Sequence, residues 1–265
     1  MSCDSLNCNN KKYFENIEQY KLAAMPAELS LTNDVIEDYD FENLNEFLLS
    51  TTTFTESKKI YGHYFNVSDI AVSSNYIASC IQSLTTKFAG IFLWDKKYNL
   101  INYKEVHKYG ITRLKFSFDG KYLIAVSKDR TTSVYEIDGI LKLKVTHTDH
   151  TRIIWDCGFS FDSIYYATCS RDKKVIIYKY FCLYQKLSFE SDVTSLEFSP
   201  IEYLIIVGLE TGEIIKIEKN NEKFSAKIQN KIFAHSKKVT CVKFNDDGKL
   251  LSSGGSDGLI NVFEI

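Results

Sequence analysis

Long apolar segments are absent from this chain of 265 residues. No hydrophobic run approaches the roughly 20 residues that a transmembrane helix needs. The first residues, MSCDSLNCNNKK, lack the apolar core of a secretion signal. These two absences predict a protein of the cytoplasm, and also of the nucleus, that does not insert into a membrane.

Motifs that mark enzymes and metal sites are also scarce. The sequence contains neither a G-x-x-x-x-G-K-[ST] phosphate loop nor an H-E-x-x-H pair, and Gly254-Gly255 is explained by a tight passage from strand to turn. Its seven cysteines include no C-x-x-C pair and mostly fall where a strand needs a small apolar residue. We therefore predict reduced, structural cysteines, no catalytic residues, no metal, no cofactor and no small-molecule substrate.

Charge is distributed unevenly along the chain. Residues 1–57 contain 11 acidic residues against three lysines, a net charge of −8, whereas residues 58–265 contain 29 basic against 23 acidic residues, a net charge of +6. A basic segment attracts an acidic protein surface or a polyanion, and an acidic leader competes for it. The alternative is that these charges only solvate loops.

An internal repeat is the strongest positive signal. The same frame fits 107–137, 150–180 and 235–265, and each copy reads as three short strands joined by turns. After its leading His, each copy has an aromatic residue nine positions on and aspartates 12 and 22 positions on: Phe116, Phe159 and Phe244; Asp119, Asp162 and Asp247; Asp129, Asp172 and Asp257. A strand-rich period near 40 residues is typical of a β-propeller.

Two further copies are degenerate. One spans 191–219, with Ile201 and Thr211 where the aspartates are expected, and the other runs from His63 to the Trp94-Asp95 dipeptide with an inserted loop at 82–88. Five repeats therefore fill residues 58–265. We predict an all-β fold, a WD-repeat β-propeller of five recognisable blades, and leave open whether the blades form a closed ring or an open one.

The acidic leader, residues 1–57, reads differently from the repeats. Residues 22–31 contain Pro26 and suit an edge strand or an extended arm. Residues 40–49 place apolar side chains at helical spacing behind Asp40, which predicts a short amphipathic helix. The predicted domains are thus this extension and a propeller over 58–265.

The His and Asp that recur 22 residues apart suit a structural role. A buried carboxylate needs a partner, and a nearby imidazole supplies one, completed by a Ser or Thr hydroxyl. Because the pair recurs once per blade, we interpret it as a lock of the blade and not as a catalytic pair. The predicted locks are His107 with Asp129, His150 with Asp172, and His235 with Asp257.

Cations gather in the turns of two successive repeats. The turns before the first strand and those between the second and third strands lie on one face of a propeller, and arginine there binds carboxylates or phosphates in two-pronged fashion. We therefore predict a contact surface for a partner protein or for RNA, with a merely solvated rim as the alternative. Its predicted members are Arg113, Lys128, Arg130, Arg152, Arg171 and Lys173.

At these residues the chain resembles a known family. HTRIIWDCGFSFDS followed by SRDKKVIIY, the preceding LKFSFDGKYLIAVSKDRTTSVY, and IYGH with the later IFLWD are similar to the later blades of the second propeller in the WD-repeat subunit of the Elongator complex, its second subunit. Members of that family carry two seven-bladed propellers. The resemblance implies either a strongly reduced protein or part of a longer one.

The resemblance also implies a function. It indicates a non-catalytic scaffold that assembles with a large scaffold subunit and an acetyltransferase subunit in a complex that modifies wobble uridines of tRNA, with a tRNA contact among the expectations. Two alternatives stay open: a generic propeller scaffold of another complex, and an RNA-binding module that acts alone through its basic face.

Overall fold

The computed structural model describes residues 60, 62–63, 65–83 and 89–265. Contacts divide the chain into two units, 1–61 and 62–265, and the second contains nearly everything that is described. The predicted arm strand at 22–31 and helix at 40–49 lie outside the described residues, as does most of the predicted loop at 82–88. The described residues contain no helix, and hence none that could cross a membrane.

Nineteen strands in the described residues form five antiparallel sheets, which we number as blades 1 to 5 in chain order. Blades 1 to 4 have four strands each, and blade 5 has three. The strands are β1 (Val67–Val72), β2 (Tyr76–Ile81), β3 (Gly90–Asp95), β4 (Leu100–Glu105), β5 (Ile111–Phe116), β6 (Tyr122–Ser127), β7 (Thr132–Ile137), β8 (Leu141–His147), β9 (Ile154–Phe159), β10 (Tyr165–Ser170), β11 (Lys174–Lys179), β12 (Cys182–Ser188), β13 (Val193–Phe198), β14 (Leu204–Leu209), β15 (Glu213–Asn220), β16 (Lys223–Phe233), β17 (Val239–Phe244), β18 (Leu250–Gly255) and β19 (Ile260–Glu264).

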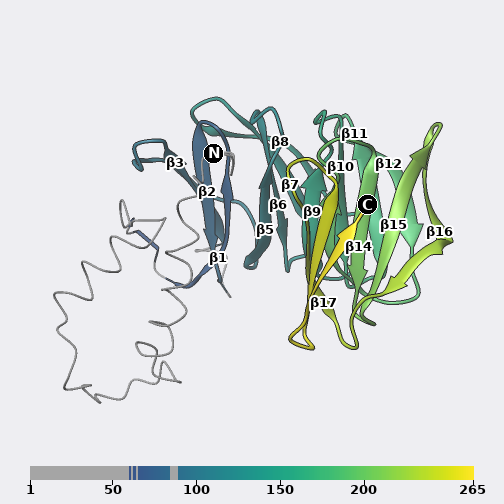
Figure 1. Ribbon diagram of the computed structural model, residues 1–265. Helices are drawn as coiled ribbons and strands as arrows, with labels where there is room; N and C mark the ends of the chain where they lie inside the picture. Colours follow the sequence, from purple (N-terminus) through teal and green to yellow (C-terminus); the bar gives the residue numbers. More distant parts are fainter. Residues whose placement is uncertain (1–59, 61, 64, 84–88) are drawn as a thin grey trace, which may run out of the picture. The chain divides into compact units, whose positions relative to one another are not determined.

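The blades pack side by side through their first strands. β1 packs on β5, β5 on β9, β9 on β13 and β13 on β17, so these five inner strands line a common channel. Figure 1 shows the sheets following one another along the chain, with the yellow strands of blade 5 beside the green strands of blade 4. The predicted all-β propeller fold with five blades is confirmed.

Burial follows from this arrangement. The second strands of the middle blades, such as β10 and β14, are buried at every position because neighbouring blades cover both of their faces. Outer strands such as β4 alternate between exposed and half-buried side chains. The buried apolar residues form four clusters, and each cluster joins two successive blades. The core of the protein is thus a series of junctions between blades.

The first aspartate of each repeat shapes the turn between the first and second strands. Asp119, Asp162 and Asp247 each accept the backbone N–H two residues on, at 3.0–3.1 Å. Ser117 and Ser160 also donate a hydrogen bond to their aspartates. This local bonding holds the tight hairpin, which explains why an aspartate recurs at this position of the frame.

Hydroxyl side chains fasten one blade to the next. At the position five residues after each repeat's leading His, Ser68 donates to the carbonyl of Ile111 at 3.0 Å, and Thr112 donates to that of Ile154 at 2.7 Å. Thr194 donates to the carbonyl of Val239 at 2.6 Å. We call these three bonds the interblade latches. Each satisfies a carbonyl of the neighbouring inner strand, which would otherwise lack a partner inside the packed junction.

The series of blades is open within the described residues. β17 does not pack closely on β1 as the other inner strands pack on one another, and the two strands line cavities of about 560 and 480 Å³ instead. Apolar side chains are exposed in both end blades, among them Ile70 (58% exposed) on β1 and Ile260 (78% exposed) on β19. A fourth strand of blade 5 is not among the described strands.

Candidate interaction surface

The imidazole of His150 lies between two partners. Its Nδ1 is 2.9 Å from Asp172 Oδ2, and its Nε2 is 2.8 Å from Thr168 Oγ1. The carboxylate of Asp172 also accepts the backbone N–H groups of Thr151 and Lys174. With the proton on Nδ1, His150 donates to the carboxylate and accepts from the hydroxyl. The carboxylate therefore ties the turn between β10 and β11 to the loop before β9.

Blade 5 repeats this geometry, whereas blade 2 differs in two ways, one of which is that His107 Nδ1 also lies 2.8 Å from Thr131 Oγ1. His235 Nδ1 lies 3.1 Å from Asp257, and its Nε2 lies 2.8 Å from Ser253 Oγ. His107 Nδ1 lies 3.1 Å from Asp129, but its buried Nε2 has no partner in the described part of the chain. The cause is the residue 18 positions after the His, which is Ala125 in blade 2 and carries no hydroxyl.

These contacts alter the acidity of the carboxyl groups. Burial alone would raise the pKa of Asp129 and Asp172, but hydrogen bonds from the imidazole and from backbone N–H groups outweigh it. The pKa of both carboxyls therefore lies below the ordinary value. A carboxylate that stays charged under a buried imidazole is a stable hydrogen-bond acceptor, which suits a lock.

Five of the six predicted contact residues lie at one end of the blades. Lys128 and Arg130 lie in the turn between β6 and β7, and Arg171 and Lys173 lie in the corresponding turn of blade 3. Arg152 lies in the loop before β9. All but Lys128, which is half-buried, are exposed. We call these five residues the basic face.

Two members of the basic face have an unusual backbone. Arg130 and Lys173 have φ angles of +74° and +65°, in the left-handed region that favours glycine. In blades 4 and 5 the corresponding turns carry Gly212 and Gly258, with φ of +89° and +82°. The chain thus has a cationic side chain where glycine would fold with less strain, and such outliers are typical of functional sites.

Not every cation of the basic face is free. Arg171 Nε lies 3.4 Å from Asp192, and Lys173 donates to the carbonyl of Glu190 at 3.1 Å. Arg130 and Arg152 have no ion-pair partner among the described residues. These two arginines are therefore the best placed to bind an anionic group of a partner.

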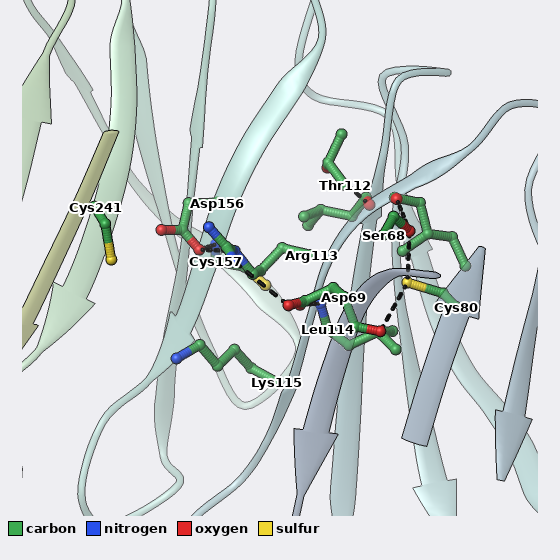
Figure 2. A network of polar contacts seen from close by, with 12 residues as sticks. Ser68, Asp69, Cys80, Thr112, Arg113, Leu114, Lys115, Asp156, Cys157 and Cys241 are labelled. Carbon is green, nitrogen blue, oxygen red and sulfur yellow. Dashed lines mark hydrogen bonds and ion pairs between the residues drawn. The ribbon is translucent and has the colours of Figure 1, made fainter. Parts of the chain in front are cut away.

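The sixth predicted contact residue, Arg113, was placed wrongly in a turn. It lies inside strand β5 and points into the channel, where Nε is 3.1 Å from Asp156 and Nη1 is 3.4 Å from Asp69 (Figure 2). The period-two alternation of an inner strand directs this side chain inward. Its two carboxylates raise the pKa of the guanidinium, Asp156 more than Asp69.

The two carboxylates also bind the neighbouring backbone. Asp69 Oδ2 accepts the N–H of Leu114 at 2.7 Å, and Asp156 Oδ2 accepts that of Leu196 at 3.1 Å. Asp156 is only 5% exposed, and burial raises its pKa against the opposing charges of Arg113 and Lys115. Arg113 of blade 2 therefore joins carboxylates of blades 1 and 3 (Figure 2), and Asp156 extends the network to Leu196 of blade 4.

A second set of charges lines the channel two residues further along the inner strands. Lys115 lies 3.3 Å from Glu197, and Lys243 donates to the same carboxylate oxygen at 2.5 Å. These residues belong to blades 2, 4 and 5. The channel is therefore lined by paired charges, which hold the inner strands and leave little net charge for a ligand.

The sequence reasoning missed residues at the channel mouth beside the basic face. A cavity of about 480 Å³ there is lined by Lys128, Trp155 and Lys238 together with the inner strands. Lys238 lies 4.8 Å from the ring centre of Trp155 and 3.5 Å from Glu210. The RIIW string contains this tryptophan, but its position in an apparent strand gave no sign that the ring lines the mouth.

Residues 254–258, GGSDG, match the G-x-S-x-G pattern of a nucleophile elbow, which the explanation as a strand-to-turn passage overlooked. An elbow requires a strand followed by a helix, whereas these residues connect β18 to β19. His235 is bound by Asp257 and Ser253, not by Ser256. The string is thus part of a blade lock and not a catalytic triad.

The cysteines divide into two groups. Cys80, Cys157 and Cys169 are free and buried, and burial raises the pKa of Cys80 to about 12. Cys182 and Cys241 are free and exposed, which differs from the expected structural role. In the described residues, no three His, Cys, Asp or Glu side chains are grouped as a metal site.

The chain matches a known family of repeats and is similar in sequence to known proteins. The segments 99–136, 141–179 and 226–264 match the family described as WD domain, G-beta repeat. Elongator complex protein 2 of Mus musculus is 31% identical over 203 residues, covering 64% of this chain and 24% of that protein. That of Drosophila melanogaster is 30% identical over 252 residues, covering 83% and 32%. That of Saccharomyces cerevisiae is 31% identical over 231 residues, covering 77% and 29%.

The chain is a WD-repeat homologue of Elongator complex protein 2. It spans about a quarter to a third of the length of these relatives. Each matched repeat of this homologue begins at the outer strand of one blade and ends at the third strand of the next, as 141–179 does from β8 to β11. The degenerate copy in blade 4 is outside the three matches.

A solved structure of the mitotic checkpoint complex shares the fold. One chain of it superposes with a TM-score of 0.72 at 19% identity, covering 82% of this chain and 66% of that one. At this identity the likeness shows the propeller fold alone.

Proposed function

We propose that this chain acts as a non-catalytic scaffold subunit of an Elongator-type complex, one that modifies wobble uridines of tRNA. The observation that supports this proposal is the similarity to Elongator complex protein 2 in mouse, fly and yeast, which extends over 64–83% of the chain. The proposed protein partners are a large scaffold subunit and an acetyltransferase subunit, and the proposed locations are the cytoplasm and the nucleus.

The basic face is the proposed contact with a partner. Arg130 and Arg152 are exposed and unpaired within the described residues, and the turn of Arg130 keeps a strained backbone where other blades have glycine. Exposed cations of this kind bind an acidic protein surface or an RNA backbone. The channel offers a weaker candidate, because its charges already neutralise one another.

The function is tested by tagging the chain in its native cell and identifying the proteins and RNA that co-purify. We expect a large scaffold and an acetyltransferase. Recovery with other proteins only would favour a generic propeller scaffold, and recovery with tRNA but no protein would favour a stand-alone RNA-binding module. Either result overturns the proposal.

The contact is tested separately with two matched variants. Arg130→Gly with Arg152→Ser removes both free cations and relieves the strained turn, so co-purification should be lost while thermal stability is kept or raised. The control, Lys96→Glu with Lys97→Glu, changes charge in the exposed turn between β3 and β4, at the opposite end of the blades. If the first variant still recovers its partners, the contact lies outside the basic face.

A further inference from the structure

The hairpin of β11 and β12 turns through two aromatic residues, Tyr180 and Phe181. The strands pair up to Lys179 and Cys182, so these two residues form the whole loop. Their φ angles are +48° and +66°. A two-residue turn with both φ angles positive is strongly preferred by Asn-Gly or Gly-Gly, and large aromatic residues rarely adopt it.

Packing explains the unfavourable backbone conformation of only one of the two residues, Phe181. The ring of Phe181 lies 4.9 Å from that of Tyr122, edge to face, and 6.1 Å from that of Tyr166. Burial of Phe181 between blades therefore compensates for its backbone. Tyr180 is 63% exposed, and its strained conformation holds an aromatic ring out at the hairpin tip. Folding alone gives no reason for a tyrosine there.

Two lysines contact aromatic rings of blades 3 and 4 near this end of the sheets. Lys179 Nζ lies 5.6 Å from the ring centre of Tyr180 and 5.5 Å from that of Tyr165. Lys219 Nζ lies 4.9 Å from the ring centre of Tyr165 and 4.2 Å from that of Tyr203. Both ammonium groups therefore contact the ring of one buried tyrosine, Tyr165. We call Tyr165, Lys179, Tyr180, Tyr203 and Lys219 the tyrosine–lysine patch.

No salt bridge among the described residues pairs with the lysines of this patch. Neither Lys179 nor Lys219 lies within ion-pair distance of a carboxylate in the described part of the chain. The nearest acidic group to Tyr203, Asp162, accepts the tyrosine hydroxyl. Cation–π contacts with the rings of Tyr165 and Tyr203 explain how the lysines are held, but they do not require the exposed ring of Tyr180.

We propose that the tyrosine–lysine patch binds single-stranded nucleic acid. One unstacked base stacks on the ring of Tyr180, and the phosphates beside it contact Lys179 and Lys219. An exposed aromatic ring beside unpaired cations is how proteins bind single strands, since every base has a face to stack and every nucleotide a charge. An acidic polypeptide would use the lysines but has no need of a free ring. The patch lies at the end of the blades opposite the basic face, so the proposal does not rest on the proposed function.

Fluorescence anisotropy with the full chain tests the proposal. The probe is a fluorescein-labelled single-stranded RNA of mixed sequence, about 12 nucleotides long, and we expect it to bind more tightly than its own duplex. Tyr180→Asn removes the ring and keeps a residue that accepts positive φ, so affinity should fall at least about tenfold while the unfolding temperature stays the same or rises. Lys179→Gln with Lys219→Gln should reduce the slope of log K against log salt by about 1.4, as two lost phosphate contacts require.

Two further variants keep the test decisive. Tyr98→Asn changes another tyrosine of positive φ, at +65°, in a turn of blade 1 and should leave RNA affinity unchanged. Tyr180→Trp should retain binding, and its added fluorescence should be quenched when RNA stacks on it. The proposal is wrong if single-stranded RNA does not bind, if Tyr180→Asn binds as well as the native chain, if no quenching occurs, or if polyglutamate displaces the RNA at equal charge.

Discussion

Blades 3 and 5 have the same repeat frame but very different burial. In blade 3, every residue of β10 is buried, β9 is buried except at Trp155, and β11 is buried except at its two ends. In blade 5, β18 has two fully buried residues and β19 has none. The local lock is nevertheless the same in both, since each His contacts an Asp through Nδ1 and a hydroxyl through Nε2.

The difference in burial comes from the number of blades that pack against each of these two blades. Blade 3 packs between blades 2 and 4, whereas blade 5 packs on blade 4 alone within the described residues. The lock depends on residues within one repeat, so it forms in both. Burial depends on the next blade, so the frame alone does not determine it. Mutations at matched positions of the two blades separate these contributions.

The largest difference is expected at the channel position six residues after the leading His. Asp156→Ala in blade 3 should destabilise the protein by about 3–5 kcal/mol, because it removes a buried partner of Arg113 and leaves the N–H of Leu196 unpaired. Cys241→Ala, the exposed counterpart in blade 5, should change stability by less than about 0.5 kcal/mol. Urea unfolding of both variants gives the comparison, and equal losses would show that the channel network does not support the fold.

The lock itself should have a smaller effect. Asp172→Ala is expected to cost about 2–4 kcal/mol, because His150 and two backbone N–H groups lose a buried acceptor. Asp257→Ala should cost less, since blade 5 is more exposed to water. Chemical denaturation measures the free energy of unfolding of both variants. A change within about 0.5 kcal/mol for Asp172→Ala would contradict the structural role of the lock.

The interblade latch should be weaker still. Thr194→Val keeps the side-chain shape but removes the donor to Val239 at the junction of blades 4 and 5, so a loss of about 1–2 kcal/mol is expected. Thr240 occupies the same position in blade 5 and, among the residues that the structure describes, donates to Gly254 of its own blade alone. Thermal melts of Thr240→Val should therefore lie close to those of the native chain. If Thr194→Val and Thr240→Val lower the unfolding temperature equally, the hydrogen bond within the blade contributes to stability and the latch does not.

The smallest effect concerns the incomplete lock of blade 2. Ala125→Ser adds the hydroxyl that blades 3 and 5 provide, and the unpaired Nε2 of His107 gains a donor. We expect a gain of about 1 kcal/mol. The midpoint of urea unfolding should rise in this variant, while Ala125→Val, which adds bulk without a donor, should lower it. A fall in both would show that the site has no room for the hydroxyl.

The sequence predicted the parts of the fold that form within one repeat. Strand order, turns and the pairs His150 with Asp172 and His235 with Asp257 all depend on fixed spacings, which repetition reveals. The channel network was missed because its partners, such as Asp69 and Leu114, lie about one repeat apart and meet only through the packing of inner strands. Arg113 was misplaced for the same reason, and nothing in its spacing distinguished a channel residue from a turn residue.

The interblade latches have a consequence for how the protein comes apart. Each latch and each apolar cluster joins successive blades, although the Lys115–Glu197 ion pair joins blades 2 and 4. The free energy of this array is therefore mostly a sum of nearest-neighbour terms, as in a one-dimensional Ising chain. Opening an end blade then breaks its interface with one neighbouring blade, whereas opening blade 3 breaks its interfaces with two. Amide hydrogen exchange should therefore be slowest in β10 and become faster toward β2 and β18, a gradient of protection that runs outward from the middle of the series.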